Sequence, residues 1–306
     1  MAKTTAVSPL APAAFPQLPV IEGVAFSTVA AGVRYKDRPD VMLAKCVPGT
    51  TIAGVFTRSA TRAAPVLDCQ EKLGGPSDQG AAILVNSGNA NAFTGRNGQE
   101  AVASITHATA AACSVPERRV FTSSTGVIGE PLPHARVTKH LADLNDALDP
   151  AGIETAARAI MTTDTFPKGA SAEVLIDGKP VKIAGIAKGS GMIAPDMATM
   201  LVYVFTDARI GQQALQSIVS EHSETTFNAI TVDSDTSTSD SLIVAATGAS
   251  GVDVSEHPAF SAEMRSVMLE LAHLVVRDGE GATKFVEITV SGAASDKDAK
   301  THAMSI

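Results

Sequence analysis

A glycine- and proline-containing loop runs directly into an apolar strand over residues 188–205, where the sequence reads KGSGMIAPDMATMLVYVF. The apolar and β-branched run at 200–205 is typical of a buried strand. Just before the loop, strands at 173–176 and 181–186 flank Asp177 and Gly178, an Asp-Gly pair that accepts the positive φ of a hairpin turn. A loop rich in glycine and small polar residues lets backbone amides approach a small ligand closely.

The same patterns extend outward over the whole chain, after a proline-rich lead-in at 1–20 and before a polar tail. Further strands are predicted at 23–33, 51–56, 80–85, 119–123, 229–232, 241–246 and 285–290, and helices at 99–113, 135–148, 153–161, 212–221 and 262–276. Helices and strands that alternate without strict βαβ regularity predict a layered α/β or α+β sandwich.

The composition excludes several classes of protein. The 306 residues are 45% hydrophobic and 18% charged, which excludes an intrinsically disordered chain. The net charge is −8 and no basic tract occurs, so we expect no nucleic-acid partner. Apolar runs such as 201–205 are too short to span a bilayer, and three cysteines give no disulfide framework. These features predict a soluble, cytoplasmic protein without a membrane partner.

The common catalytic and metal-binding motifs are absent. The sequence contains no GxSxG, HExxH or phosphate-loop motif, and its seven histidines are scattered outside the glycine-rich loops. The acidic residues Asp233, Asp235 and Asp240 resemble the start of a calcium-binding loop, but Thr238 stands where that loop needs glycine. A solvated or hydrogen-bonded turn is the better interpretation, and we predict no metal site.

Covalent catalysis would therefore need a base other than histidine. One known solution is an N-terminal α-amine that activates the hydroxyl of its own residue. Thr199 lies between the loop and the strand, where cleavage before it would free an amine with a pKa near 8. From the residues alone, an ordinary threonine at the start of a strand is the simpler interpretation.

The loop and several other motifs together resemble one known family. The segment KGSGMIAPDMATML at 188–201 resembles the self-cleavage segment of the ornithine acetyltransferases, also called glutamate N-acetyltransferases, of arginine biosynthesis. Other motifs that resemble this family, in family order, are NSGNAN at 86–91, STGVIGEP at 124–131, IMTTDT at 160–165, FNAITVD at 227–233, DTST at 235–238 and GEGATK at 279–284.

The resemblance implies a fold and a division of the chain. The fold would be the layered α/β sandwich of the ornithine acetyltransferases, in which the precursor cleaves itself between Ala198 and Thr199. Residues 1–198 would form an α chain and residues 199–306 a β chain, assembled as a heterotetramer of two α and two β chains. The family continues beyond the position of Ile306, so we expect this chain to lack a C-terminal segment of the family.

The resemblance also implies a reaction. Thr199 would take acetyl from N-acetylornithine and pass it to glutamate by a ping-pong mechanism, with its own amine as general base. Thr125 and Gly126 would form the oxyanion hole. The residues that would contact substrate are Thr162, Lys188, Thr199 and Glu280. No cofactor is expected, while use of acetyl-CoA as a co-substrate, which would make the enzyme bifunctional, is decided by no residue.

Two alternatives stay open at this stage. One is a self-cleaving aminopeptidase of similar architecture, which would release amino acids from peptides instead of transferring acetyl groups. The other is an inactive chain that lacks part of its site because of the missing C-terminal segment.

Overall fold

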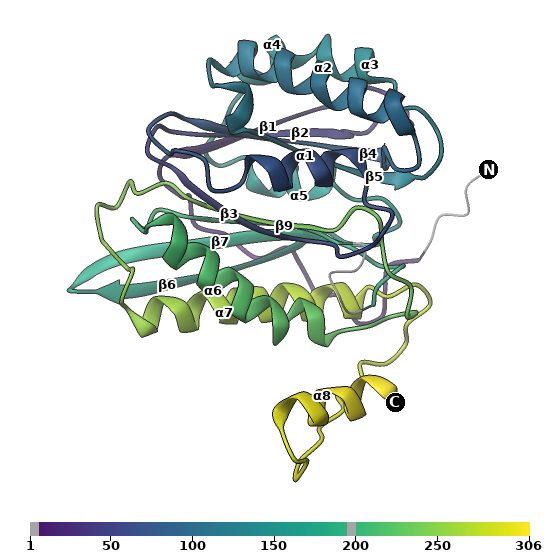
Figure 1. The fold of residues 1–306 in the computed structure, drawn as a ribbon, viewed down its shortest axis with the longest axis vertical. Coiled ribbons are helices and arrows are strands. Elements are labelled where there is room, and N and C mark those ends of the chain that lie inside the picture. The colour runs from purple at the N-terminus through teal and green to yellow at the C-terminus, as the bar shows by residue number, and fades with distance from the viewer. Residues whose placement is uncertain (1–5, 195–199) are drawn as a thin grey trace.

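The computed structural model describes residues 6–194 and 200–306, and these form two β-sheets with helices between and outside them (Figure 1). The strand order is β1-β2-β4-β5 in the first sheet and β3-β9-β8-β7-β6 in the second. The layered α/β sandwich predicted from the sequence is therefore confirmed.

The first sheet is mostly antiparallel. Its strands are β1 (Val24–Val29), β2 (Val41–Cys46), β4 (Ala81–Asn89) and β5 (Val120–Val127). Only β4 and β5 run parallel to each other, joined by the long helix α2 (Gly95–Cys113). A parallel pair needs such a crossover because its strands enter the sheet from the same edge.

The second sheet has five strands among the described residues. They are β3 (Thr51–Phe56), β6 (Lys168–Ile176), β7 (Lys179–Lys188), β8 (Leu201–Thr206) and β9 (Ser241–Ala246). Strands β6 and β7 form the predicted hairpin, and β8 and β9 run parallel. Every residue of β8 and β9 is buried, as expected of central strands covered on both faces.

Helices separate and cover the two sheets (Figure 1). Helices α1 (Ala64–Lys72) and α5 (Ile153–Ala159) lie between the sheets, where their apolar side chains share a buried cluster with Phe26 and Phe205. Helix α2 covers the outer face of the first sheet together with α3 (His134–Thr138) and α4 (Leu141–Asp146). Residues 6–194 and 200–306 therefore form three hydrophobic cores, one on each outer face and one between the sheets.

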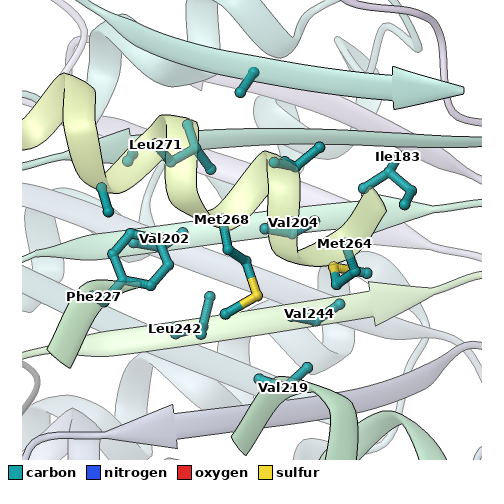
Figure 2. Packing of buried hydrophobic residues seen from close by; sticks show 14 of the residues in the cluster. Ile183, Val202, Val204, Val219, Phe227, Leu242, Val244, Met264, Met268 and Leu271 are labelled. Atoms are coloured by element: carbon teal, nitrogen blue, oxygen red, sulfur yellow. The ribbon is translucent and has the colours of Figure 1, made fainter. Parts of the chain in front are cut away.

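The outer face of the second sheet is covered by α6 (Gln212–Glu224) and α7 (Pro258–Arg277). Met268 and Leu271 of α7 lie in one buried cluster with Val204 of β8 (Figure 2). Burial of large apolar side chains such as these is the main stabilising contribution to a fold of this kind. No helix within the described ranges is long and apolar enough to cross a membrane.

Two predicted strands are wrong. The stretch 229–232 forms no strand, because the 3-10 turn η2 (Phe227–Ala229) precedes it and the Val232 N–H donates to the Ile193 carbonyl of a loop. The stretch 285–290 alternates like a strand but has no regular structure and no sheet neighbour, and Val286 is 69% exposed. Alternation predicts a strand only where a partner strand lies beside it.

Other differences concern short elements. The helix predicted at 135–148 is two short helices, because the chain turns at Lys139 and His140 between α3 and α4. Strand β2 and helix α1 were not predicted. The polar tail contains helix α8 (Asp296–Ser305), whose first turn is capped by Ser295 Oγ accepting the Asp298 N–H. It lies apart from the layers in Figure 1, shown in yellow.

Candidate active site

Three strand ends of the second sheet meet in one row. Lys188, the last residue of β7, is paired with Leu201 at the start of β8, and Leu201 is paired with Ser241 at the start of β9. Because β7 is antiparallel to β8, the loop that follows Lys188 begins beside the point where β8 begins. Segments far apart in the sequence are thereby collected at one edge of the sheet.

Lys188 connects this edge to the first sheet. Its side chain is buried, and Nζ lies 3.3 Å from the Thr125 hydroxyl oxygen and 4.0 Å from Oδ2 of Asp164. Burial lowers the pKa of Lys188 and the Asp164 carboxylate raises it, with a net pKa below that of an ordinary lysine. Among the described residues Thr125 is the one hydrogen-bond partner of this ammonium group, so Lys188 keeps donors for a bound anion.

Thr125 and Gly126 lie where β5 ends beside β4. Gly88 and Gly126 both have positive φ, at +99° and +129°, and a Cβ added to Gly126 would lie 2.3 Å from the Gly88 carbonyl carbon. Only glycine fits this approach of two backbones. Gly126 is exposed while Thr125 is buried, so an accessible backbone and a buried hydroxyl lie side by side. Neutral donors in such an arrangement are what an oxyanion hole requires.

Thr162 is partly exposed and belongs to a segment that is bonded to the loop after Lys188. The Thr162 N–H donates to Oδ2 of Asp164 at 3.0 Å, and the Gly189 N–H donates to Oδ1 of the same carboxylate at 2.6 Å. The hydroxyl oxygens of Thr163 and Ser190 are 2.6 Å apart. Through these bonds the structure brings Thr162 and Lys188 to the same carboxylate, Asp164.

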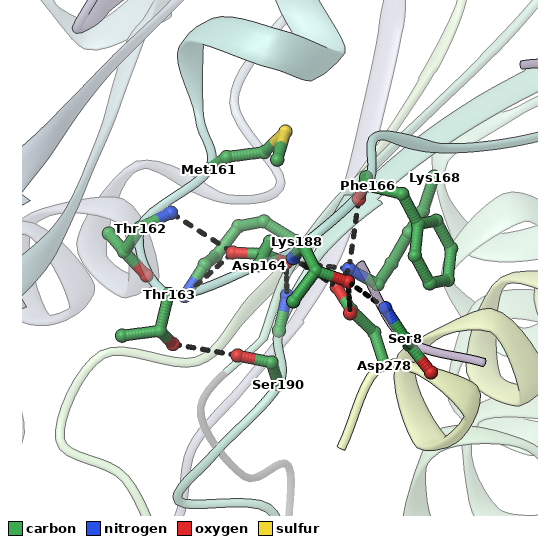
Figure 3. Close-up of polar contacts among 12 residues, drawn as sticks. Ser8, Met161, Thr162, Thr163, Asp164, Phe166, Lys168, Lys188, Ser190 and Asp278 are labelled. Carbon is green, nitrogen blue, oxygen red and sulfur yellow. Dashed lines mark hydrogen bonds and ion pairs between the residues drawn. The ribbon is translucent and has the colours of Figure 1, made fainter. Parts of the chain in front are cut away.

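A buried ion network lies behind these residues (Figure 3). Lys168 Nζ is 2.7 Å from Asp164 Oδ1 and 2.6 Å from Asp278 Oδ2, and all three side chains are fully buried. Burial alone would raise the pKa of Asp164, but the ammonium groups of Lys168 and Lys188 hold that pKa below its ordinary value. The Asp164 carboxylate is therefore charged and has partners on both oxygens.

Glu280 follows α7 and contacts the same loop. Its N–H donates to the Ser190 carbonyl at 2.8 Å, and a Cβ added to Gly191 would lie 2.8 Å from Oε1 of Glu280. The absence of a side chain at Gly191 thus makes room for this carboxylate. Glu280 is thereby attached to the loop that begins at Lys188, and its negative charge raises the pKa of Lys188 slightly against the larger effect of burial.

A cavity of about 510 Å³ lies beside Glu280 and is also lined by Thr163, Thr165 and Asp278. Its volume suits a small polar molecule. A more spacious cavity, of about 740 Å³, lies between β1 and the end of α2 and contains none of the predicted site residues. Of the predicted site residues, Glu280 lines the smaller cavity, whereas Lys188, Thr125, Gly126 and Thr162 do not.

The predicted cleavage position, Ala198 and Thr199, lies outside the described residues. The backbone before it is held by Asp233, whose carboxylate accepts the N–H groups of Met192 and Ile193. Met192 has a φ of +59°, a left-handed conformation that costs free energy for a non-glycine residue. Asp233 of the acidic loop thus accepts two backbone hydrogen bonds.

Asp240 holds the backbone on the other side of that position. Its Oδ1 accepts the Met200 N–H at 2.8 Å, while Oδ2 is buried without a hydrogen-bond partner among the described residues. Burial raises the pKa of Asp240 well above its ordinary value, and the Met200 N–H and the Ser237 hydroxyl lower it only in part. A carboxyl group in this environment favours its neutral form.

Sequence reasoning missed the charged residues behind the site. Asp164 lies inside the motif at 160–165, but no role was predicted for it, and Asp278 lies between the helix predicted at 262–276 and the motif at 279–284. Lys168 carried no signal, because its two partners lie 4 and 110 residues away in the sequence. Only the fold reveals that these side chains meet.

Comparison with known proteins agrees with the resemblance noted in the sequence. The model of the ArgJ family matches residues 25–306. The arginine biosynthesis bifunctional protein ArgJ of Ruegeria pomeroyi is 69% identical over 306 residues, which cover all of this chain and 75% of that protein. The protein of the same name from Gluconobacter oxydans is 53% identical over 312 residues, covering all of this chain and 73% of that protein.

Solved structures give the same result. An arginine biosynthesis bifunctional protein ArgJ from Bacillus halodurans is 32% identical, with a TM-score of 0.51 over 59% of this chain and 92% of that chain. An ornithine acetyltransferase from Mycobacterium tuberculosis, solved with ornithine, is 34% identical, with a TM-score of 0.52 over 62% of this chain and 95% of that chain. On sequence and structure alike, the chain belongs to the ArgJ family, the acyltransferases of arginine biosynthesis.

Proposed function

We propose that the chain transfers acetyl from N-acetylornithine to glutamate in two half-reactions through an acetyl-Thr199 intermediate. The observation that carries the proposal is the 3.3 Å contact between Lys188 Nζ and Thr125 Oγ1. It places a buried cation beside the accessible backbone of Gly126, at the edge where β8 begins. This arrangement suits a reaction in which negative charge develops on a carbonyl oxygen.

In the first half-reaction, the Thr199 hydroxyl oxygen adds to the acetyl carbonyl carbon of N-acetylornithine. The freed α-amine of Thr199 takes the hydroxyl proton and returns it to the departing amine nitrogen as the carbon–nitrogen bond breaks. Thr125 and Gly126 would stabilise the oxyanion. In the second half-reaction the amine of glutamate attacks the acetyl ester and restores the hydroxyl.

Charged residues account for recognition of the amino-acid part of both substrates. Lys188, which keeps unused donors, would bind an α-carboxylate, and Glu280 would bind an amine. Thr162 would contact the same molecule from the segment that Asp164 holds. Ornithine is the ligand named for the M. tuberculosis relative, which supports an amino acid as the substrate class.

The proposal includes a division of the chain and an assembly. Self-cleavage before Thr199 would give an α chain of residues 1–198 and a β chain of residues 199–306, assembled as two α and two β chains in the cytoplasm. No cofactor takes part. Acetyl-CoA would serve as a second acetyl donor, so that the enzyme also synthesises N-acetylglutamate; the word bifunctional in the relatives' names supports this second activity.

The first experiment is the intact mass of the purified protein, with Thr199→Ala as the control. Cleavage before Thr199 divides the 31.3 kDa chain into fragments of about 20 and 11 kDa, the smaller beginning with the nucleophile. Two fragments from the parent and one species from the control are expected. An uncut parent would contradict the proposal and favour the inactive chain that the sequence left open.

A second experiment tests the acetyl intermediate. The cleaved enzyme is incubated with N-acetylornithine and isotope-labelled ornithine, without glutamate, and label in N-acetylornithine is measured. A ping-pong enzyme exchanges the label because the acetyl-enzyme forms before glutamate binds. Release of amino acids from peptides without acetyl exchange would instead indicate the aminopeptidase, an alternative that the family match does not favour.

A further inference from the structure

Two buried lysines face a single carboxylate in the candidate site. Lys168 Nζ lies 2.7 Å from Oδ1 of Asp164, whereas Lys188 Nζ lies 4.0 Å from Oδ2 of the same group. Asp278, at 2.6 Å, holds Lys168 from its other side. The two ammonium groups therefore compete for Asp164, and Lys168 is the one bonded to it (Figure 3).

Both oxygens of Asp164 have hydrogen-bond donors other than Lys188. Its Oδ1 also accepts the Gly189 N–H at 2.6 Å, and its Oδ2 accepts the Thr162 N–H at 3.0 Å. Lys188 lies outside hydrogen-bond distance of both oxygens and donates instead to Thr125. Lys188 thus lies beside Thr125 while another cation, Lys168, is bonded to Asp164.

We propose that Lys168 is a positioning residue for the amino-acid substrate, because it occupies Asp164 and so leaves Lys188 free to bind the substrate anion beside Thr125. This inference rests on the proposed function, in which Lys188 binds that anion. Without Lys168, the buried Asp164 carboxylate would take Lys188 as its partner, since an unpaired buried charge is strongly unfavourable. Lys188 would then leave Thr125.

A merely structural role for Lys168 would be to neutralise the charges of two buried aspartates. Two variants separate the roles. Asp278→Asn removes one of these carboxylates but leaves Lys168 on Asp164. Asp278→Asn combined with Lys168→Met also removes the cation, while the charges that remain, on Asp164 and Lys188, are balanced. The two variants differ only in whether Lys168 is present.

The first measurement is the affinity for ornithine, by calorimetry. We expect the double variant to bind ornithine about tenfold or more weakly than Asp278→Asn, the usual effect of losing a hydrogen bond from a charged group. The thermal unfolding of both variants is followed alongside, because a structural role would change stability without a selective loss of binding. Equal affinities in the two folded variants would overturn the proposal.

The second measurement is a crystal structure of each variant, which needs neither activity nor ligand. We expect the Lys188 Nζ to Asp164 distance to shorten from 4.0 Å to hydrogen-bond distance in the double variant and to stay long in Asp278→Asn. If Lys188 keeps its contact with Thr125 in the double variant, the proposal is contradicted. A parent that binds no ornithine would contradict the proposed function alone, since the Lys188 position still tests Lys168.

Lys168→Arg offers a further test if the double variant does not fold. It keeps a cation on Asp164, so ornithine affinity should stay close to that of the parent. A loss of tenfold or more in a folded Lys168→Arg protein would show that the positive charge on Asp164 is not what keeps Lys188 in place.

Discussion

The Lys188 ammonium nitrogen and the Thr125 hydroxyl oxygen lie 3.3 Å apart although their strands, β7 and β5, belong to different sheets. The sheets also touch through the rings of Phe26 and Phe205, whose centroids are 5.0 Å apart, but the contact of Lys188 with Thr125 is polar and lies near the ends of both strands. A cation from one sheet thus lies beside a hydroxyl group from the other, at the candidate site. The sandwich architecture therefore builds the site as well as the core.

Lys188→Met should impair substrate binding more than folding. The variant removes the cation that faces the predicted substrate site, while Lys168 still neutralises Asp164. We expect the KM for N-acetylornithine to rise about tenfold or more, as for the loss of one charge-assisted hydrogen bond. Steady-state kinetics measure this change. Lys182→Met, on the same strand but partly exposed, is the control and should keep the parent KM.

Gly126→Ala should disrupt the junction of β4 and β5. The added Cβ would lie 2.3 Å from the Gly88 carbonyl carbon, and the φ of +129° is unfavourable for alanine. Together, the clash and the backbone strain should cost at least about 2 kcal/mol of unfolding free energy. Urea unfolding and intact mass measure the loss of stability and of self-cleavage.

Gly129→Ala is the matched control for that variant. Gly129 also has a positive φ, of +86°, but an added Cβ there meets no atom within 4 Å. The control should lose only about 1 kcal/mol, the cost of the backbone strain alone. If both variants lose the same stability, the close approach of the two backbones is not what requires glycine at position 126.

Strands and turns whose formation depends on a short stretch of sequence could be predicted from that stretch. Strands such as β3 and β9 follow from short apolar runs, and the β6–β7 hairpin follows from Asp177 and Gly178. The stretch 285–290 shows the limit of this approach. Its alternation is as regular as that of a real strand, but no strand pairs with it among the described residues, and pairing is a property of the fold and not of the segment.

The candidate site could be predicted only in part, because motifs are local in the sequence whereas the contacts that hold the site are not. The motifs pointed to Lys188, Thr125, Thr162 and Glu280, and the structure places each of them on or beside the loop that begins at Lys188, while their roles stay predictions. The contacts that hold those residues were not predictable. Lys168 meets Asp278 across 110 residues of sequence, and neither residue type nor spacing indicates such a buried pair. Thr199 stays a prediction.

Leu271→Ala should destabilise the core on the outer face of the second sheet without altering any residue of the candidate site. Leu271 is fully buried in α7, and Gly185 of β7 leaves room for it, because a Cβ there would lie 2.8 Å from the leucine side chain. Removing the side chain should cost about 2–5 kcal/mol through lost burial and the cavity left behind. Urea unfolding measures this cost. Leu67→Ala, at a side chain that is 39% exposed, should cost much less, and equal losses would contradict the packing described here.

Asp240→Asn should change how stability depends on pH. Burial raises the pKa of Asp240 in the folded chain well above the ordinary value of 3.8, so the folded state holds a proton that the unfolded state loses as the pH rises. The carboxyl group thus stabilises the fold most below its unfolded pKa, and this contribution is lost as the pH rises toward the folded pKa. Asparagine is neutral throughout, and its side-chain oxygen can still accept the Met200 N–H.

The advantage of the asparagine variant over the parent should therefore grow between pH 5 and pH 8, as measured by urea unfolding at each pH. Asp235→Asn, in the same acidic loop but exposed, should follow the parent at both pH values. A variant that loses the same stability at pH 5 and pH 8 would mean that the carboxyl group is ionised in the fold, and that a charged Asp240 holds the start of β8.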